Sequence, residues 1–351
     1  MGVPKCRIIK YVTLFVPAIS PAISCDLIFA VWWKFLNFAF AMCPYLLTII
    51  IPHKDIPELL HRCLGSMPRR DDVQVIVADD HSECDTQTLL TEWGFAGVTF
   101  CRTESPAGGG AARNLGLSLA QGEWVTFVDA DDFLTPLAGE IIDSLKQVDE
   151  KVDVVYCAAC SVDSVNFTTS DRADWLNKHI SMYAINPHEA EMRLRYTFGE
   201  PWCKIVRRSL IEKHNIDFDT TRIHNDTKYS YLTGHYADKV KMDSRALCTI
   251  TTRSGSVSRT LTEANKLQRI EVFGREDKFF EENGIPHRYQ IRFLWAQMAR
   301  SLFENRDTFR QGVRTLRGLG IKRSRIAKMT AKHVVRNAMV KAVKGVLKRF
   351  K

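Results

Sequence analysis

Short apolar runs alternate with helical patterns from Leu46 to Val128, and this alternation is the strongest constraint on the fold. The runs that predict strands are Leu46–Pro52, Val73–Ala78, Val98–Cys101 and Val125–Val128. The segments between them predict the helices Pro57–Leu64, Thr86–Trp93 and Ala111–Ala120. Strands that alternate with helices favour an α/β fold, with a mostly parallel sheet and helices on both faces. Ligands bind at the carboxyl ends of the strands in such a sheet.

Three carboxylates, those of Asp129, Asp131 and Asp132, directly follow the strand Val125–Val128. Alternate side chains of a strand share a face, so we expect Asp129 and Asp131 to point the same way if the extended geometry continues. Two carboxylates held together repel each other unless a cation lies between them. Such oxygen ligands suit Mg²⁺ or Mn²⁺, which keep positions open for substrate phosphates. The alternative is a plain loop ahead of a helix that begins near Pro136.

The pattern changes beyond residue 150 and becomes mainly helical from Ala264 onward. We expect strands over Val152–Ala159, Trp202–Val206, Val240–Met242 and Ala246–Thr251. We expect helices over Pro187–Tyr196, opened by Asn186, over Leu210–His214, capped by Ser209, and from Asp226 to His235. The predicted parts are an uncertain segment 1–44, an α/β domain 45–260 with halves 45–150 and 151–260, and a basic helical region 261–351.

The first 44 residues leave three interpretations open. The apolar run Tyr11–Cys25 resembles a weak signal peptide with a cleavage-like site at Ala22–Ser24. The run Leu27–Met42 is slightly short for a membrane span, which needs about 20 apolar residues. The interpretation that we adopt is that translation begins at Met42, and a membrane anchor is the second choice.

Composition places the chain among globular proteins. Of its 351 residues 45% are hydrophobic and 25% are charged. Among the ten cysteines, Cys157 and Cys160 form a C-x-x-C without a second pair or a nearby histidine, so we expect buried thiols in a reducing compartment. The net charge of +9 belongs mostly to the tail, because no acidic residue follows Asp307.

The tail combines apolar and basic residues at helical spacing. Val335, Met339, Val343, Val346 and Phe350 recur at roughly helical intervals, and lysine and arginine fill much of the remaining surface. A cationic amphipathic helix can lie on an anionic membrane surface. A solvated helix that packs on its own domain is the alternative. We expect no nucleic-acid binding, because aromatic residues are not interleaved with the charges.

Four segments, taken in order, resemble family 2 glycosyltransferases, which have the Rossmann-like GT-A fold. They are LLTIIIPHKD (46–55), VIVADDHSECD (75–85), GGGAARNLGLSLAQGEWVTFVDADDFL (108–134) and WCKIVRRSLIEKHNIDFDTTRIHND (202–226). The third segment is the most specific, because it joins an Ala-Arg-Asn helix to an Asp-x-Asp strand at the family's spacing. The resemblance extends from about Leu46 to Ser258 and points to bacterial capsule and lipopolysaccharide enzymes.

This resemblance implies transfer of a hexose-type sugar from a nucleotide-diphosphate sugar, UDP-linked above all, to a glycan or lipid-linked hydroxyl. The transfer would be inverting and would depend on Mn²⁺ or Mg²⁺ bridging the diphosphate. The implied role is cell-surface polysaccharide synthesis in the cytoplasm, peripherally on the inner face of the plasma membrane.

The resemblance also assigns roles to individual residues. Asp226 would be the general base that takes the proton of the acceptor hydroxyl, whereas a simple helix N-cap is the alternative. The nucleotide sugar is expected at Pro52, Asp79 or Asp80, Arg113, Asp129 and Ala130, and the metal at Asp129 and Asp131. The acceptor is expected beside Trp202, Lys204 and Asn225, although Trp202 could equally belong to the core.

Two departures from the family pattern keep other functions open. Asn225 stands where the family usually has Glu, and this supports a catalytically inactive relative that serves as a membrane-associated assembly partner. His53 and Lys54 replace a frequent Tyr-Asn pair, which puts the base and ribose contacts there in doubt. A nucleotidyltransferase on a similar sheet is a further alternative, but the chain lacks the phosphate-gripping basic motif expected early in the sequence.

Overall fold

The computed structural model describes residues 45–253, 262–289 and 293–349, and the side chains among them except those of residues 337 and 340–349. Contacts separate residues 1–44 from the unit Tyr45–Lys351, which is described here. The three interpretations of the N-terminal segment therefore lie outside the described residues, as do the side chains of Val343, Val346 and Phe350. Within the described ranges, no helix is both long enough and apolar enough to cross a membrane.

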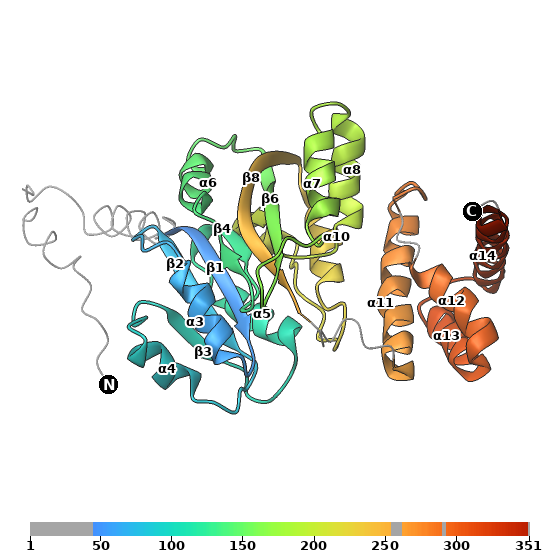
Figure 1. The fold of residues 1–351 in the computed structure, drawn as a ribbon, viewed down its shortest axis with the longest axis horizontal. Coiled ribbons are helices and arrows are strands. Elements are labelled where there is room, and N and C mark those ends of the chain that lie inside the picture. Colours follow the sequence, from blue (N-terminus) through green and yellow to red (C-terminus); the bar gives the residue numbers. More distant parts are fainter. Residues whose placement is uncertain (1–44, 254–261, 290–292, 350–351) are drawn as a thin grey trace, which may run out of the picture. The chain divides into compact units, whose positions relative to one another are not determined.

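An eight-stranded mixed sheet forms the centre of the described unit (Figure 1). Its strands are β1 (Tyr45–His53), β2 (Val73–Asp79), β3 (Thr99–Arg102), β4 (Gly122–Phe127), β5 (Phe133–Leu134), β6 (Val152–Asp163), β7 (Lys204–Arg207) and β8 (Lys239–Thr252). Their order is β3-β2-β1-β4-β7-β6-β8-β5. The neighbours β3, β2, β1 and β4 are parallel, as are β6 and β8, whereas β7 is antiparallel to both of its neighbours and β5 is antiparallel to β8. The carboxyl ends of β1, β2 and β4 thus meet at one edge.

Helices cover this sheet and form the C-terminal region (Figure 1). The helices of the α/β part are α3 (Pro57–Gly65), α4 (Thr86–Glu92), α5 (Gly109–Ser118), α6 (Ala138–Leu145), α7 (Asp174–Met182), α8 (Pro187–Thr197), α9 (Arg208–Lys213) and α10 (Thr227–Tyr236). Those of the C-terminal region are α11 (Glu263–Glu282), α12 (Phe293–Glu304), α13 (Arg306–Gly318) and α14 (Arg323–Arg349). The C-terminal helices have a small core of their own, built around Ile270, Trp295, Met298 and Leu316. The division at residue 260 stays a prediction.

Several of the expected elements differ from those in the structure. The predicted strands Val240–Met242 and Ala246–Thr251 form one strand, β8, because a bulge after Asp243 absorbs the polar residues between them. Helix α9 begins at Arg208, so Ser209 lies inside the helix and does not cap it. Helix α7 was not expected. By contrast, Asn186 caps α8 as predicted, since its side chain accepts a hydrogen bond from the Glu189 amide at 3.2 Å.

A glycine fixes how closely α5 approaches the sheet. A Cβ atom added to Gly116 would lie 2.5 Å from Cγ2 of Ile50, which is fully buried in β1. Protein cores have few voids, so such a side chain could not be accommodated without displacing α5. Because α5 also carries Arg113 and Asn114, this contact sets the position of one wall of the site described below.

We predict that Gly116→Ala lowers the free energy of unfolding by about 1–3 kcal/mol, the usual cost of overpacking a core. Gly139→Ala in α6 is the matched control, because a Cβ atom there would meet nothing within 4 Å. Alanine in an open helical position should stabilise by up to about 1 kcal/mol. Urea denaturation of both variants measures the difference, and equal stabilities would contradict the close packing of α5.

Candidate active site

An open cleft with a volume of about 790 Å³ lies at the carboxyl ends of β1, β2 and β4. Most of the residues assigned from the sequence line it: Pro52, Asp80, Arg113, Asp129, Ala130, Asp131, Asn225 and Asp226. The other lining residues are His53, Lys54, Ile56, Pro106, Ala107, Gly108, Gly109, Thr220, Arg222, Ile223, His224 and Arg253. Asp79, Trp202 and Lys204 are not among them.

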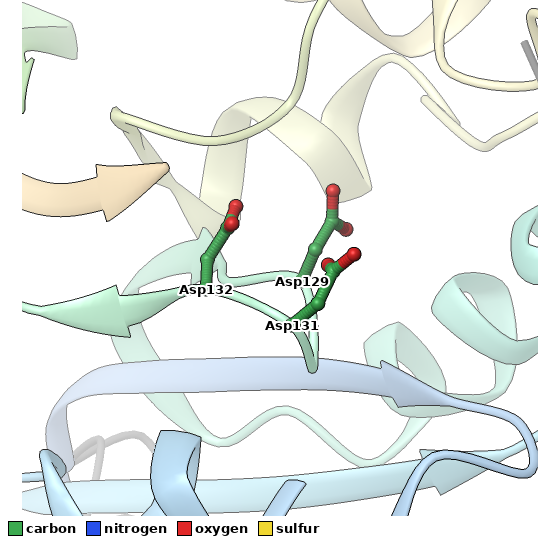
Figure 2. Close-up of side chains that lie close together, drawn as sticks. All are labelled: Asp129, Asp131 and Asp132. Atoms are coloured by element: carbon green, nitrogen blue, oxygen red, sulfur yellow. The ribbon is translucent and has the colours of Figure 1, made fainter. Parts of the chain in front are cut away.

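A turn, and not a continued strand, brings the carboxylates after β4 together. The strand ends at Phe127, and the Asp132 amide donates a hydrogen bond to the Asp129 carbonyl at 2.9 Å. The extended geometry on which the expectation for Asp129 and Asp131 depended therefore ends before these residues, although their carboxylates still lie together. Figure 2 shows the carboxylates of Asp129, Asp131 and Asp132 on the same side of the turn, and one oxygen from each lies within 4.8 Å of the others. Asp132 is thus a third member of the cluster that sequence reasoning did not assign.

Neighbouring elements hold this turn in place. The Thr251 amide of β8 donates to Oδ1 of Asp132 at 2.7 Å, and the Thr251 hydroxyl donates to the carbonyl of Asp131 at 2.8 Å. From α3, the Arg62 guanidinium donates to the same Asp131 carbonyl. The aspartate cluster is therefore fixed from two sides by residues far away in the sequence.

The electrostatics of the aspartate cluster favour a cation. Burial, together with the charges of Asp129 and Asp131, raises the pKa of Asp132 well above its usual value. Burial and the charge of Asp129 also raise the pKa of Asp131, although Arg253 opposes this with its Nε 3.3 Å from Oδ2. Closely spaced carboxylate oxygens are hard ligands, so the donor set fits Mg²⁺ or Mn²⁺ and does not suit a metal that prefers sulfur.

The two aspartates after β2 have different surroundings. Asp80 lines the cleft and accepts hydrogen bonds from the amides of Ala107 at 2.8 Å and Gly108 at 2.9 Å. Through these hydrogen bonds Asp80 ties the glycine loop to the sheet. Gly108 itself has a φ of +89°, a conformation that favours glycine. Asp79 is fully buried and pairs with His53 and Ser82. Of the two alternatives for nucleotide contact, only Asp80 faces the cleft.

The geometry explains why a histidine can occupy position 53. The Ile56 amide donates to His53 Nε2 at 3.2 Å, so the proton of the neutral ring resides on Nδ1. Nδ1 lies 3.4 Å from Oδ1 of Asp79. His53 therefore stabilises the start of the loop after β1, and it does not offer a free nitrogen to a ligand.

Arg113 connects the two sides of the cleft. Its Nη2 donates to Oδ1 of Asp129 at 2.6 Å, and its Nη1 donates to Oδ1 of Asn225 at 3.0 Å. Next to it in α5, Asn114 exchanges hydrogen bonds with both the carbonyl and the amide of Phe218, at 2.9 and 2.8 Å. The Ala-Arg-Asn helix thus fixes the position of the aspartate cluster relative to the loop before α10.

The same loop approaches the start of α5 too closely for a side chain. A Cβ atom at Gly110 would lie 1.9 Å from the Asp219 carbonyl. The third of the three glycines before Ala111 is therefore required by a backbone contact, in addition to any role in approaching a ligand.

Asp226 precedes the first residue of α10 and lines the cleft. Its side chain makes no capping hydrogen bond, so the interpretation of Asp226 as a plain N-cap is wrong. Burial raises its pKa to about 6, against the opposing charge of Arg113 and with a smaller contribution from Glu200. A carboxylate with a pKa near neutrality is well suited to accept a proton during a reaction.

Trp202 and Lys204 lie in the interior. Lys204 is fully buried in β7, donates from Nζ to the Phe198 carbonyl at 2.7 Å, and has its pKa lowered by burial to about 7. Trp202 packs edge-on against Phe198, with ring centroids 5.1 Å apart. Both side chains meet the core, and neither lines the cleft. Their acceptor role stays a prediction without support from this geometry.

Helix α11 supports the loop that carries Asp226. The Oε1 atom of Gln268 accepts from the Ile223 amide at 3.1 Å, and Nε of Arg269 donates to Nε2 of His224 at 3.1 Å. Arg275 pairs with Asp219 at 2.8 Å. These contacts, which join residues of the C-terminal region to residues 219–224, were not foreseen because no local pattern indicates them.

A neutral histidine and three basic residues also line the cleft. His224 has a φ of +54°, and burial and the charge of Arg269 lower its pKa to about 4, so its neutral ring accepts a hydrogen bond. Lys54, Arg222 and Arg253 add positive charge to the cleft walls. Sequence reasoning did not assign these three cations, although Arg253 lies within the stretch Leu46 to Ser258 that the resemblance covers.

We predict that Gln268→Ala speeds amide hydrogen exchange over residues 219–226 and lowers the unfolding free energy by about 1–3 kcal/mol. The physical reason is that the buried Ile223 amide loses its acceptor. Lys278→Ala, on the same helix with an exposed ion pair to Glu282, is the control. If both variants exchange alike over residues 219–226, α11 does not hold this loop.

Comparisons with known proteins agree with this architecture. Residues 48–214 match the family model described as glycosyl transferase family 2. The putative glycosyltransferase EpsH of Bacillus subtilis is 28% identical over 165 residues, which are 45% of this chain and 46% of that protein. The glycosyltransferase GlyA of Streptococcus pneumoniae is 24% identical over 256 residues, which are 68% of this chain and 35% of GlyA. The chain thus spans less than half the length of these two relatives.

A third relative matches a shorter stretch. The poly(ribitol-phosphate) beta-N-acetylglucosaminyltransferase TarP of Staphylococcus aureus is 32% identical over 93 residues, which are 25% of this chain and 28% of TarP.

Solved structures show the same fold. Residues 1–349 of S. aureus TarS in complex with UDP-GlcNAc superpose with a TM-score of 0.59 at 19% identity, covering 82% of this chain and 88% of that one. A mannosyltransferase from Pyrobaculum calidifontis in complex with GDP-Man and Mn²⁺ gives a TM-score of 0.50 at 16% identity, covering 88% and 87%. The expected GT-A-type fold is confirmed. Over residues 48–214, the chain is similar to glycosyltransferase family 2.

Proposed function

We propose that the chain transfers a sugar from a nucleotide-diphosphate sugar, with UDP as the leading candidate, to a hydroxyl group of a glycan or lipid-linked acceptor. One observation carries this proposal: Asp226, whose pKa is raised to about 6, shares a single cleft with the aspartate cluster, and Arg113 lies between them. TarS in complex with UDP-GlcNAc and the mannosyltransferase with GDP-Man and Mn²⁺ have the same fold and support a nucleotide-sugar donor.

On the donor side, Asp129 and Asp131, joined by Asp132, would hold Mn²⁺ or Mg²⁺. Such an ion offsets negative charge on a departing diphosphate. Lys54 and Arg222 carry positive charge on the same cleft and would bind the phosphates directly. Pro52, Asp80 and Ala130 also line the cleft and would contact the nucleoside and ribose.

On the acceptor side, Asp226 would take the proton of the acceptor hydroxyl while that oxygen attacks the anomeric carbon and the bond to the diphosphate breaks. A single displacement places the new bond opposite the leaving group, so the anomeric centre is inverted. Asn225 would keep Asp226 in position through its hydrogen bond with Arg113.

The inactive-relative alternative rests on Asn225 in place of Glu. In the structure, the amide oxygen of Asn225 accepts from Arg113 while Asp226 remains on the cleft wall. The substitution thus preserves the position of the proposed base. This geometry favours an active enzyme, and the two experiments below separate the alternatives.

We further propose that the acceptor belongs to a bacterial cell-surface polysaccharide and that the enzyme works peripherally at the cytoplasmic face of the plasma membrane. The names of the relatives EpsH and TarP, as glycosyltransferases of bacteria, support the first part. Val335 and Met339 are exposed on α14, beside the basic residues Lys332 and Arg336, which supports contact with an anionic membrane surface.

We predict that UDP stabilises the protein in thermal denaturation and that Mn²⁺ increases this effect. A ligand at 100 times its dissociation constant adds about 2.7 kcal/mol. Asp131→Asn should abolish the contribution of Mn²⁺, because it removes a charged ligand of the cluster, whereas Asp71→Asn, at an exposed position outside the cleft, should behave like the parent. Folded protein that shows no shift with UDP, GDP, CDP or dTDP would instead favour the inactive relative.

We predict that Asp226→Asn lowers the rate of sugar transfer by roughly 10²- to 10⁴-fold, the usual contribution of a general base, while UDP binding persists. In the parent, transfer should rise with pH through about 6, because the carboxyl must lose its proton before it can act as a base. Asp217→Asn, at an exposed ion pair with Lys228, is the control.

The decisive measurement is the pH profile of the transfer rate together with the affinity for UDP. A profile that is flat between pH 5 and 7 in the parent, at unchanged UDP binding, would exclude Asp226 as the base.

A further inference from the structure

A second groove lies beside the catalytic cleft. It has a volume of about 290 Å³ and lies between α11, α12 and the loop before α10. Its lining residues are His224, Arg269, Phe273, Phe293, Ala296, Gln297 and Arg300. His224 lines both this groove and the catalytic cleft, so the two share a wall. We name it the α11–α12 groove.

The α12 side of the groove is one face of a single helix. Phe293, Ala296, Gln297 and Arg300 follow one another at intervals of three, one and three residues, which places them on the same side of an α-helix. Phe293 is 68% exposed, although it is a large aromatic residue. An exposed ring on a groove wall offers a flat apolar surface to a ligand.

Aromatic rings continue from this exposed residue toward the catalytic cleft. The ring centroids of Phe293 and Phe273 are 5.9 Å apart, and those of Phe273 and His224 are 4.8 Å apart. His224 lies two residues before Asp226, so their Cα atoms are at most about 7 Å apart. An acceptor chain whose reacting unit lies at Asp226 therefore reaches the groove with only one or two further repeating units.

The charge of the groove selects for anions. Arg269 and Arg300 line it, and none of the described residues that line it carries a carboxylate. Among the residues that the structure describes, none with a carboxylate forms an ion pair with Arg300, and its side chain is exposed. The ring of His224 is neutral and accepts from Arg269, so it adds no competing charge. Guanidinium groups bind phosphate oxygens in a bidentate manner, and this makes phosphate a suitable partner.

We infer that the α11–α12 groove binds the acceptor next to its reacting unit, and that this part of the acceptor carries a phosphodiester group. The reacting hydroxyl would lie at Asp226, the neighbouring unit would pass His224 and stack on Phe293, and its phosphate would contact Arg300. This inference rests on the proposed function. A bounded groove that continues the catalytic cleft fits a segment of a chain, whereas a flat bilayer surface would not enter it.

The test measures binding of a short poly(glycerol phosphate) oligomer to the full chain by isothermal titration calorimetry, with a neutral dextran oligomer as the comparison ligand. Phe293→Ala and Arg300→Gln should each weaken binding of the phosphate oligomer by roughly tenfold, because each removes one direct contact with it. Binding to the parent should also weaken as salt is added. Neither variant should change the affinity for UDP.

Two matched variants test whether the loss of any exposed aromatic ring, or of any exposed arginine, has the same effect on binding. Phe303→Ala removes another exposed aromatic ring of α12, 72% exposed and outside the groove. Arg314→Gln removes an exposed arginine of α13 that is not part of the groove. Both should bind the phosphate oligomer like the parent.

The inference is overturned if the dextran oligomer binds as tightly as the phosphate oligomer, or if Phe293→Ala and Arg300→Gln bind no more weakly than their controls. It is also overturned if the parent binds UDP but not the phosphate oligomer, an outcome that leaves the proposed function intact. Loss of binding to vesicles of anionic phospholipid in Arg300→Gln, without an effect on the oligomer, would assign the groove to the membrane and reject the inference as well.

Discussion

The rest of the site depends on the two contacts that the guanidinium of Arg113 makes across the cleft. A buried charge is costly unless it is paired, and here Nη2 pairs with the carboxylate of Asp129 on one side while Nη1 donates to the amide oxygen of Asn225 on the other. This single side chain therefore spans the cleft between the aspartate cluster and the base. Its positive charge also opposes the rise in the pKa of Asp226 that burial causes, so the base keeps a pKa of about 6.

The packing of α5 makes this bridge possible. Gly116 lets the helix approach β1, and Gly110 lets the backbone of the loop before α10 come close to the helix N-terminus. Both glycines act through the absence of a side chain, and neither needs a positive φ for this role. The Ala-Arg-Asn helix therefore also has a structural role, because Asn114 holds the same loop through its hydrogen bonds with Phe218.

The C-terminal helices contribute to the site from outside the α/β part. Gln268, Arg269 and Arg275 of α11 contact the loop that leads to Asp226, and the α11–α12 groove shares His224 with the catalytic cleft. A division of the chain near residue 260 would separate the base from the helix that supports its loop. The helical region therefore belongs to the working enzyme as we propose it.

Local sequence rules were sufficient for the strands of the parallel half, the acidic residues at their carboxyl ends and the Asn186 cap, because each depends on neighbours along the chain. They failed for Asp132 because alternation of side chains holds only while a strand continues, and β4 ends at Phe127. They also did not indicate that Lys204 is buried, because its surroundings depend on the place of β7 in the middle of the sheet. The residues next to Lys204 in the sequence do not indicate that its charged side chain is buried.

The sequence by itself determined the α/β class, the edge of the sheet where polar residues gather and the family to which the chain is similar. Only the tertiary structure decided which carboxylates meet, which of Asp79 and Asp80 faces the cleft, and that Asp226 is free of a capping bond. The physical reason is distance along the chain. Arg113 and Asn225 are 112 residues apart, and His224 and Arg269 are 45 apart, so no local pattern can encode their contact.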